Sequence, residues 1–79
     1  MEIKVLGSGC SKCKKLHDTV KNAVSELQIE ANVLYITDIK EIANSGLLST
    51  PGLIINGKIV LNGRVPSLEE VKTIIRNRV

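Results

Sequence analysis

A chain of 79 residues carries enough apolar surface for one small core, so we expect a single domain over residues 1–79. Apolar residues make up 43% of it but occur in short blocks, none close to the ~20 residues that span a membrane. The net charge is only +3, and one Tyr without Trp or Phe leaves almost no stacking platform for nucleic acid. We therefore expect a cytoplasmic monomer that binds neither membranes nor nucleic acids.

The first half of the chain predicts two strands joined by a helix. Residues 2–6 predict a short strand, whose apolar stretch is too short for the core of a signal peptide. From about residue 11 to 28, apolar residues recur at spacings of three and four, which predicts an amphipathic helix with Cys13 on its apolar face. The β-favouring residues of 31–36 predict the second strand.

The second half of the chain predicts a short helix followed by a hairpin. Asp38 is followed three residues later by a glutamate, as in a capping box, so a helix should occupy 39–44. Two apolar runs, at 53–55 and 59–61, flank Asn56-Gly57. This dipeptide between apolar runs is a strong signal for two antiparallel strands.

The last predicted element is a helix that begins after Ser67, with Glu70 at its third position. The element order is therefore β-α-β-α-β-β-α. The first two strands, joined by a helix, should be parallel through a right-handed crossover, and the hairpin should add two antiparallel strands. The predicted fold class is α/β, with a four-stranded mixed sheet flanked by helices.

Both cysteines of the chain lie in the stretch GSGCSKCKK, residues 7–15, between the first strand and the first helix. At a helix start, backbone N–H groups and the positive end of the helix dipole favour an anion, and the anion of a thiol is its nucleophilic form. Lys12, Lys14 and Lys15 add positive charge. The pKa of the Cys10 thiol should therefore lie below the value of about 8.5 for a free cysteine.

The spacing of the two cysteines also suggests their separate roles. Three residues apart at a helix start, their Cβ atoms can approach within about 4 Å, the separation that a disulfide needs. Cys10 precedes the helix body and should be exposed, so it is the predicted nucleophile toward a substrate disulfide. Cys13 faces the predicted core and would resolve the mixed disulfide.

Other chemistries also use a strand, a glycine-rich turn and a helix. A dinucleotide fingerprint needs a third glycine where this chain has Lys12, and the G-K-[ST] ending of a phosphate loop is absent. Small ferredoxin-like heavy-metal-associated domains bind soft ions such as Cu(I) through C-x-x-C, but their fold ends in a strand. Binding of copper or zinc, a cluster bridged between two monomers, and a dithiol interaction without turnover stay as alternatives to disulfide exchange.

Four stretches of the chain resemble one known family. They are C-S-K-C after the first predicted strand, Thr50-Pro51 before the third, the Asn56-Gly57-Lys58 hairpin, and Gly63-Arg64-Val65-Pro66-Ser67 before the last helix. In this order they resemble the thioredoxin/glutaredoxin superfamily, most closely its minimal, glutaredoxin-sized members called redox-active disulfide proteins. The resemblance implies a thioredoxin-like fold and a thiol–disulfide oxidoreductase that exchanges electrons with protein disulfides.

The resemblance also implies how the site is completed. In the family, the proline before the third strand is cis and faces the dithiol, and the residue before it offers its backbone to an extended partner chain. The expected substrate-binding residues lie beside the dithiol and at this proline: Gly9, Ser11, Lys12, Thr50 and Pro51. No bound cofactor is expected beyond a redox-active Cys10–Cys13 disulfide. Electrons would come from a disulfide reductase, such as a thioredoxin reductase, or from a small thiol.

The chain departs from better-known members of the superfamily at several positions. Gly9 stands where thioredoxins carry an aromatic residue, so their redox potential does not transfer. A single Gly63, followed by Arg64, stands where glutaredoxins carry a glycine pair, which leaves the use of glutathione open. We expect ordinary roles for three other side chains, with His17 exposed on the helix, Tyr35 packed in the core or at the sheet edge, and Arg64 in solvent.

Overall fold

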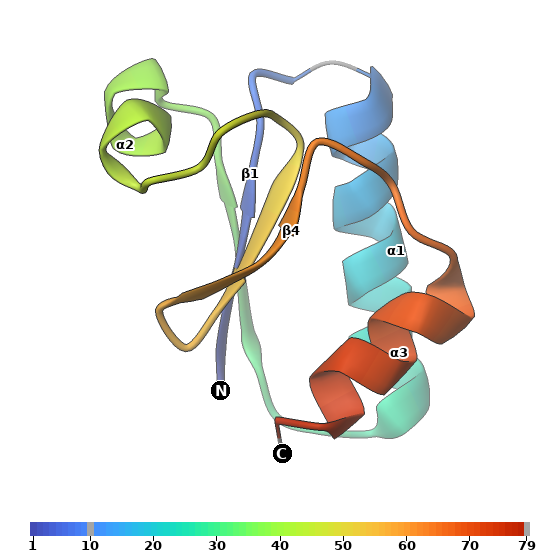
Figure 1. The fold of residues 1–79 in the computed structure, drawn as a ribbon. Helices are drawn as coiled ribbons and strands as arrows, with labels where there is room; N and C mark the ends of the chain where they lie inside the picture. Colours follow the sequence, from blue (N-terminus) through green and yellow to red (C-terminus); the bar gives the residue numbers. More distant parts are fainter. Residues whose placement is uncertain (10, 79) are drawn as a thin grey trace.

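The computed structural model describes residues 1–9 and 11–78, which form a four-stranded sheet and three helices (Figure 1). In chain order the elements are β1 (Glu2–Leu6), α1 (Ser11–Leu27), β2 (Asn32–Ile36), α2 (Ile39–Asn44), β3 (Gly52–Ile55), β4 (Lys58–Asn62) and α3 (Leu68–Arg76). The predicted order is confirmed, including the final helix that distinguishes this fold from the ferredoxin-like one. The predicted boundaries lie within one residue of these, except that the apolar pattern of the last helix continues to the C-terminus whereas α3 ends at Arg76.

The sheet has the strand order β2-β1-β3-β4 and is mixed, as predicted. β1 runs parallel to β2 and antiparallel to β3, and β4 runs antiparallel to β3. In the register, Leu6 pairs with Gly52 at one end of the sheet and Ile3 pairs with Ile55 at the other. We call the first the Pro51 end, because Pro51 immediately precedes Gly52, and the second the hairpin end.

Local side-chain and turn chemistry explains where the elements start and stop. The Asp38 carboxylate accepts a hydrogen bond from the Lys40 amide (2.9 Å) at the start of α2, and the Ser67 hydroxyl accepts one from the Glu70 amide (3.2 Å) at the start of α3. α1 ends one residue earlier than predicted because Gln28 adopts a left-handed backbone (φ 53°).

The hairpin turn also follows from its two residues. Asn56 and Gly57 both have positive φ (49° and 84°), as a type I′ turn requires. The Asn56 side chain adds a further contact, because its Oδ1 accepts a hydrogen bond from the Glu2 amide (2.9 Å). The hairpin is thereby tied to the start of β1.

One face of the sheet carries the hydrophobic core. α1 and α3 both lie on this face, and α2 lies on the other (Figure 1). An ion pair between Lys72 and Glu26 (3.2 Å) also connects α3 to α1. The buried core side chains come from β1, α1, β3, β4 and α3: Ile3, Val5, Leu16, Val20, Ala23, Leu53, Ile55, Leu61, Val71 and Ile75. No helix in the described part of the chain has the length and apolar character to cross a bilayer.

The opposite face of the sheet is less covered, since α2 buries none of its residues. Because Ile3 and Val5 point into the core, Lys4 between them points to this face. The strand register places Lys4 in a row across the sheet with Leu34, Ile54 and Ile59. The Lys4 side chain is 39% exposed and lies 3.8 Å from the Glu2 carboxylate, which explains how a central strand accommodates a lysine.

Candidate functional site

The Pro51 end of the sheet brings together the predicted site segments. β1 and β3 are antiparallel, and Leu6 pairs with Gly52, so Gly7 follows and Pro51 precedes this last pair at the same end of the sheet. The Gly7 amide donates to the Ile36 carbonyl (3.0 Å), which fixes this turn to β2 as well. Figure 1 shows the turn after β1, the segment before β3 and the segment after β4 at the same end of the molecule as the first turn of α1.

The Cys13 side chain packs against the backbone of Gly7. Cys13 is fully buried on the apolar face of α1. A Cβ built on Gly7 would overlap the Cys13 Sγ and would lie 2.6 Å from the Cys13 Cβ, so only glycine fits at this position. The Cys13 sulfur is therefore packed at the same end of the sheet as Pro51, which precedes the Gly52 partner of Leu6. The prediction that Cys13 faces the core is confirmed, whereas the role of Gly7 was not predicted.

Cys10 lies outside the described residues, so its nucleophilic role and its disulfide with Cys13 stay predictions. Its described neighbours leave space for a partner. Gly9 has φ +89°, and a Cβ built there would meet nothing within 4 Å. Ser11, the first residue of α1, and Lys12 are exposed.

The first turns of α1 carry positive charge. Lys12, Lys14 and Lys15 are all exposed, and the first turn of α1, described from Ser11, contains no acidic residue. The backbone dipole of the helix adds to the same potential. The lysines and the helix dipole together favour an anion at the start of this helix.

Thr50 and Pro51 form the second side of the site. Thr50 is exposed, Pro51 is buried, and the peptide bond between them is cis. The Gly63 amide donates to the Pro51 carbonyl (2.8 Å). Ser49 packs closely on Gly63, where a Cβ would lie 3.3 Å from the Ser49 Cβ and closer still to its hydroxyl. The segment before β3 is therefore held by the residues that follow β4.

Two more residues of this segment were not predicted from the sequence. Leu48 donates its amide hydrogen to the Asn62 Oδ1 (3.1 Å), and its own side chain is 91% exposed. Leu47, beside it, covers Gly52, where a Cβ would lie 2.8 Å from the Leu47 Cγ. No sequence motif indicates these contacts, because each depends on how the loop before β3 folds back on the strands.

Comparisons with known proteins identify the family. A family model described as a thioredoxin domain matches residues 1–76. The chain is 43% identical over 70 residues to a protein named thioredoxin from Methanocaldococcus jannaschii, covering 89% of this chain and 80% of that protein. It is 39% identical over 75 residues to a protein of the same name from Methanothermobacter thermautotrophicus, covering 95% and 97%. The chain belongs to the thioredoxin family.

The membership confirms the predicted superfamily, fold and enzyme class. The protein is a thiol–disulfide oxidoreductase of the thioredoxin family, and its four-stranded mixed sheet with flanking helices is the predicted thioredoxin-like fold. Among residues 1–9 and 11–78, no group of three or more His, Cys, Asp or Glu side chains is placed to hold a metal ion.

Two side chains, His17 and Arg64, differ from their expected roles. His17 is half-buried, not exposed, because its ring stacks on Tyr35 with 4.7 Å between centroids. Arg64 does not simply face solvent but forms a two-pronged ion pair with Glu70, one contact being 3.1 Å. This pairing lowers the pKa of the Glu70 carboxyl, mainly through the hydrogen bonds from Arg64, and raises the pKa of Arg64.

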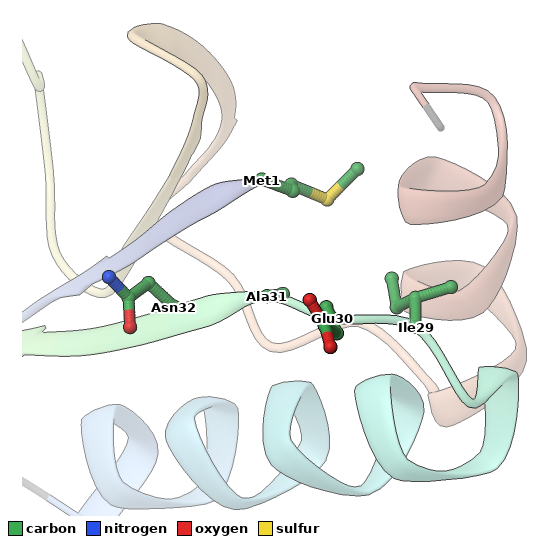
Figure 2. Close-up of a pocket in the computed structure, with 5 residues that line it drawn as sticks. All are labelled: Met1, Ile29, Glu30, Ala31 and Asn32. Atoms are coloured by element: carbon green, nitrogen blue, oxygen red, sulfur yellow. The ribbon is translucent and has the colours of Figure 1, made fainter.

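A surface pocket lies far from this thioredoxin-family site. It is lined by the residues at the start of β1 and β2, namely Met1, Ile29, Glu30, Ala31 and Asn32 (Figure 2). Because Glu2 pairs with Asn32, this pocket is at the hairpin end of the sheet. It is therefore separate from the cysteine-containing turn.

Proposed function

We propose that the protein exchanges electrons with protein disulfides through a Cys10/Cys13 dithiol. The observation that carries the proposal is the packing of the buried Cys13 against Gly7, at the same end of the sheet as Pro51. Cys13 is thus buried in the core at the end of the sheet where Thr50 and Pro51 would bind the substrate. Its partner thiol lies three residues earlier in the sequence, at the positive start of α1.

The exchange takes place in two displacement steps. The Cys10 thiolate attacks one sulfur of the substrate disulfide, which forms a mixed disulfide and releases the other substrate sulfur as a thiolate. Cys13 then attacks the Cys10 sulfur as a thiolate, forms the Cys10–Cys13 disulfide and releases the second substrate thiolate. The two protons from the dithiol end on the substrate thiols. The substrate gains two electrons, and the enzyme is left as the disulfide.

Residues around the dithiol would orient the substrate chain. Thr50 is exposed beside the buried Pro51, so an extended client can lie along its backbone, as in other cases of strand addition. Gly9, Ser11 and Lys12 border Cys10 and leave room for the client backbone. The lysines favour the thiolate state of Cys10 electrostatically.

The redox group in this proposal is the Cys10–Cys13 disulfide itself, with no bound cofactor. Regeneration of the dithiol consumes two electrons, which a disulfide reductase such as a thioredoxin reductase, or a small thiol, supplies by the reverse exchange. We place this chemistry in the cytoplasm, where such reductants keep thiols reduced.

Two cysteine variants test the assignment of roles. Cys10→Ser should abolish reduction of a protein disulfide, because the attacking sulfur is gone. Cys13→Ser should still attack but should accumulate mixed disulfides with client proteins, which mass spectrometry of trapped adducts identifies. Full activity of Cys10→Ser with a reductant that serves the wild type would overturn the assignment of the nucleophile.

Thiol titration separates disulfide exchange from metal binding. Mild oxidation of the purified protein should remove two titratable thiols per monomer without aggregation, and dithiothreitol should restore both. Metal analysis of the protein as isolated is the matched measurement. Stoichiometric copper or zinc that prevents this oxidation would contradict the proposal and favour a soft-metal site.

A further inference from the structure

Leu48 is an exposed apolar side chain at the edge of the candidate site. It lies two residues before Thr50 and is 91% exposed, more than the other large exposed apolar residues of the described chain. A single exposed leucine is common on protein surfaces and needs no special explanation. Leu48 differs because a side chain of β4 holds its backbone in place.

Asn62 holds the backbone of Leu48. Its Oδ1 accepts the Leu48 amide hydrogen at 3.1 Å, and the amide of the next residue, Gly63, donates to the Pro51 carbonyl at 2.8 Å. Two consecutive residues at the end of β4 therefore anchor both ends of the Leu48–Pro51 segment. The segment keeps a defined backbone path while the Leu48 side chain points into solvent.

An anchored segment binds a partner more tightly than a mobile one. A loop that must become ordered on binding loses conformational entropy, and a segment already held in place avoids this loss. An apolar side chain presented from such a segment gains affinity when a partner's apolar side chain covers it. An anionic or purely polar small disulfide offers no such side chain.

We propose that Leu48 determines substrate preference by contacting an apolar side chain beside the disulfide of a client polypeptide, and that Asn62 is a positioning residue for this contact. The proposal rests on the proposed disulfide exchange and names its substrate class. The preferred substrate is a polypeptide disulfide with apolar flanking residues in an extended segment. The contact affects substrate binding and leaves the sulfur chemistry unchanged.

Two synthetic peptide disulfides test the role of Leu48. In one, leucines occupy the second and third positions on either side of the cysteine, and in the other serines occupy them. Leu48→Ser should raise KM for the leucine peptide roughly tenfold, the loss of one buried leucine contact, with kcat almost unchanged. KM for the serine peptide should change less than about twofold.

Ile39→Ser is the matched control for this substitution. Ile39 is another exposed apolar residue (74%), on α2, and its replacement should leave both KM values unchanged. An equal effect of Leu48→Ser on the two peptides, or no effect on either, would overturn the role of Leu48. Failure of the wild type to reduce either peptide or hydroxyethyl disulfide would instead overturn the proposed function.

Two substitutions at Asn62 test the positioning role. Asn62→Ala should raise KM for the leucine peptide by roughly threefold, as expected for one lost hydrogen bond. Asn62→Asp retains an oxygen acceptor and should restore KM to near the wild-type value. Unchanged KM in Asn62→Ala, or an Asn62→Asp variant as impaired as Asn62→Ala, would overturn the positioning role.

Asn56→Ala controls for a general loss of stability. Asn56 also accepts a backbone amide hydrogen through its Oδ1, from Glu2, but at the hairpin end. Its substitution should lower the urea midpoint of unfolding while KM for both peptides stays at the wild-type value. A rise in KM for Asn56→Ala equal to that for Asn62→Ala would show that the effect is structural and would refute positioning.

Discussion

The two ends of the sheet use glycine for different physical reasons. At the hairpin end, Gly57 has φ +84° and a Cβ built on it would meet nothing within 4 Å, so the backbone angle alone requires glycine. At the Pro51 end, space is also limiting. There, three glycines leave no room for a Cβ because other side chains pack on them: Gly7 against Cys13, Gly52 against Leu47, and Gly63 against Ser49. At these three positions, segments distant in sequence approach closely because glycine has no side chain.

The largest expected effect is that of Gly7→Ala. The new Cβ would overlap the Cys13 sulfur, so the turn or α1 must move, and overpacking of this kind costs about 1–3 kcal/mol of stability. Because a shift of about 1 Å at reacting groups lowers rates roughly a hundredfold, disulfide reduction should fall by about ten- to a hundredfold. Urea unfolding and steady-state reduction of a protein disulfide measure the two effects.

Gly57→Ala is the matched substitution at the hairpin end. It should also cost about 1–2 kcal/mol, because alanine resists a left-handed backbone, but nothing in its surroundings has to move. The rate of disulfide reduction should therefore equal that of the wild type. Equal losses of activity in Gly7→Ala and Gly57→Ala would show that close packing at the Pro51 end has no special effect on activity.

A smaller effect is expected at Gly52, where the obstructing group is the Leu47 side chain. Gly52→Ala should destabilise the protein by about 1 kcal/mol, the lower end of the overpacking range, because the Leu47 side chain can move aside. The cost should nearly disappear when Leu47→Ala has already removed the obstruction. A double-mutant cycle from urea unfolding measures this coupling. Strict additivity of the two substitutions would show that the contact does not limit the size of residue 52.

The smallest expected effect concerns the ion pair between Arg64 and Glu70 near the Pro51 end. Because the folded state lowers the pKa of Glu70 from its usual value of 4.5, the stabilisation is complete above that value and is lost as pH falls through the lowered pKa. Glu70→Gln should therefore lose less stability than the wild type on acidification. Identical acid unfolding profiles for the two proteins would contradict this. Glu30→Gln, at an exposed glutamate near the hairpin end, is the matched control.

The fold was predictable because its signals are local. The Asn56-Gly57 turn, the Asp38 and Ser67 caps and the helical spacing around Cys13 each depend on residues a few positions apart. Such signals determine the type and order of elements. The exact end of α1 was missed by one residue because the left-handed backbone at Gln28 is not favoured by its residue type.

The candidate site was only partly predictable, because several of its contacts join segments that no local pattern connects. C-x-x-C and Thr50-Pro51 are visible as motifs, and Cys13 could be assigned to the core from its helical position. The hydrogen bond from Leu48 to Asn62 joins the loop before β3 to the last residue of β4, fourteen positions away. Gly7 could equally have served as an ordinary turn glycine, since its contact with Cys13 depends on how α1 packs on the sheet.

Lys4 places a charge in the middle of the less covered face of the sheet. On the face away from α1 and α3 it interrupts a row that would otherwise be apolar, formed with Leu34, Ile54 and Ile59. Face-to-face stacking of two sheets would have to strip water from this ammonium group, which is costly without a buried partner. A leucine at this position would create a continuous apolar patch across the four strands. The charge in the middle of the sheet therefore opposes burial of this face against a second sheet.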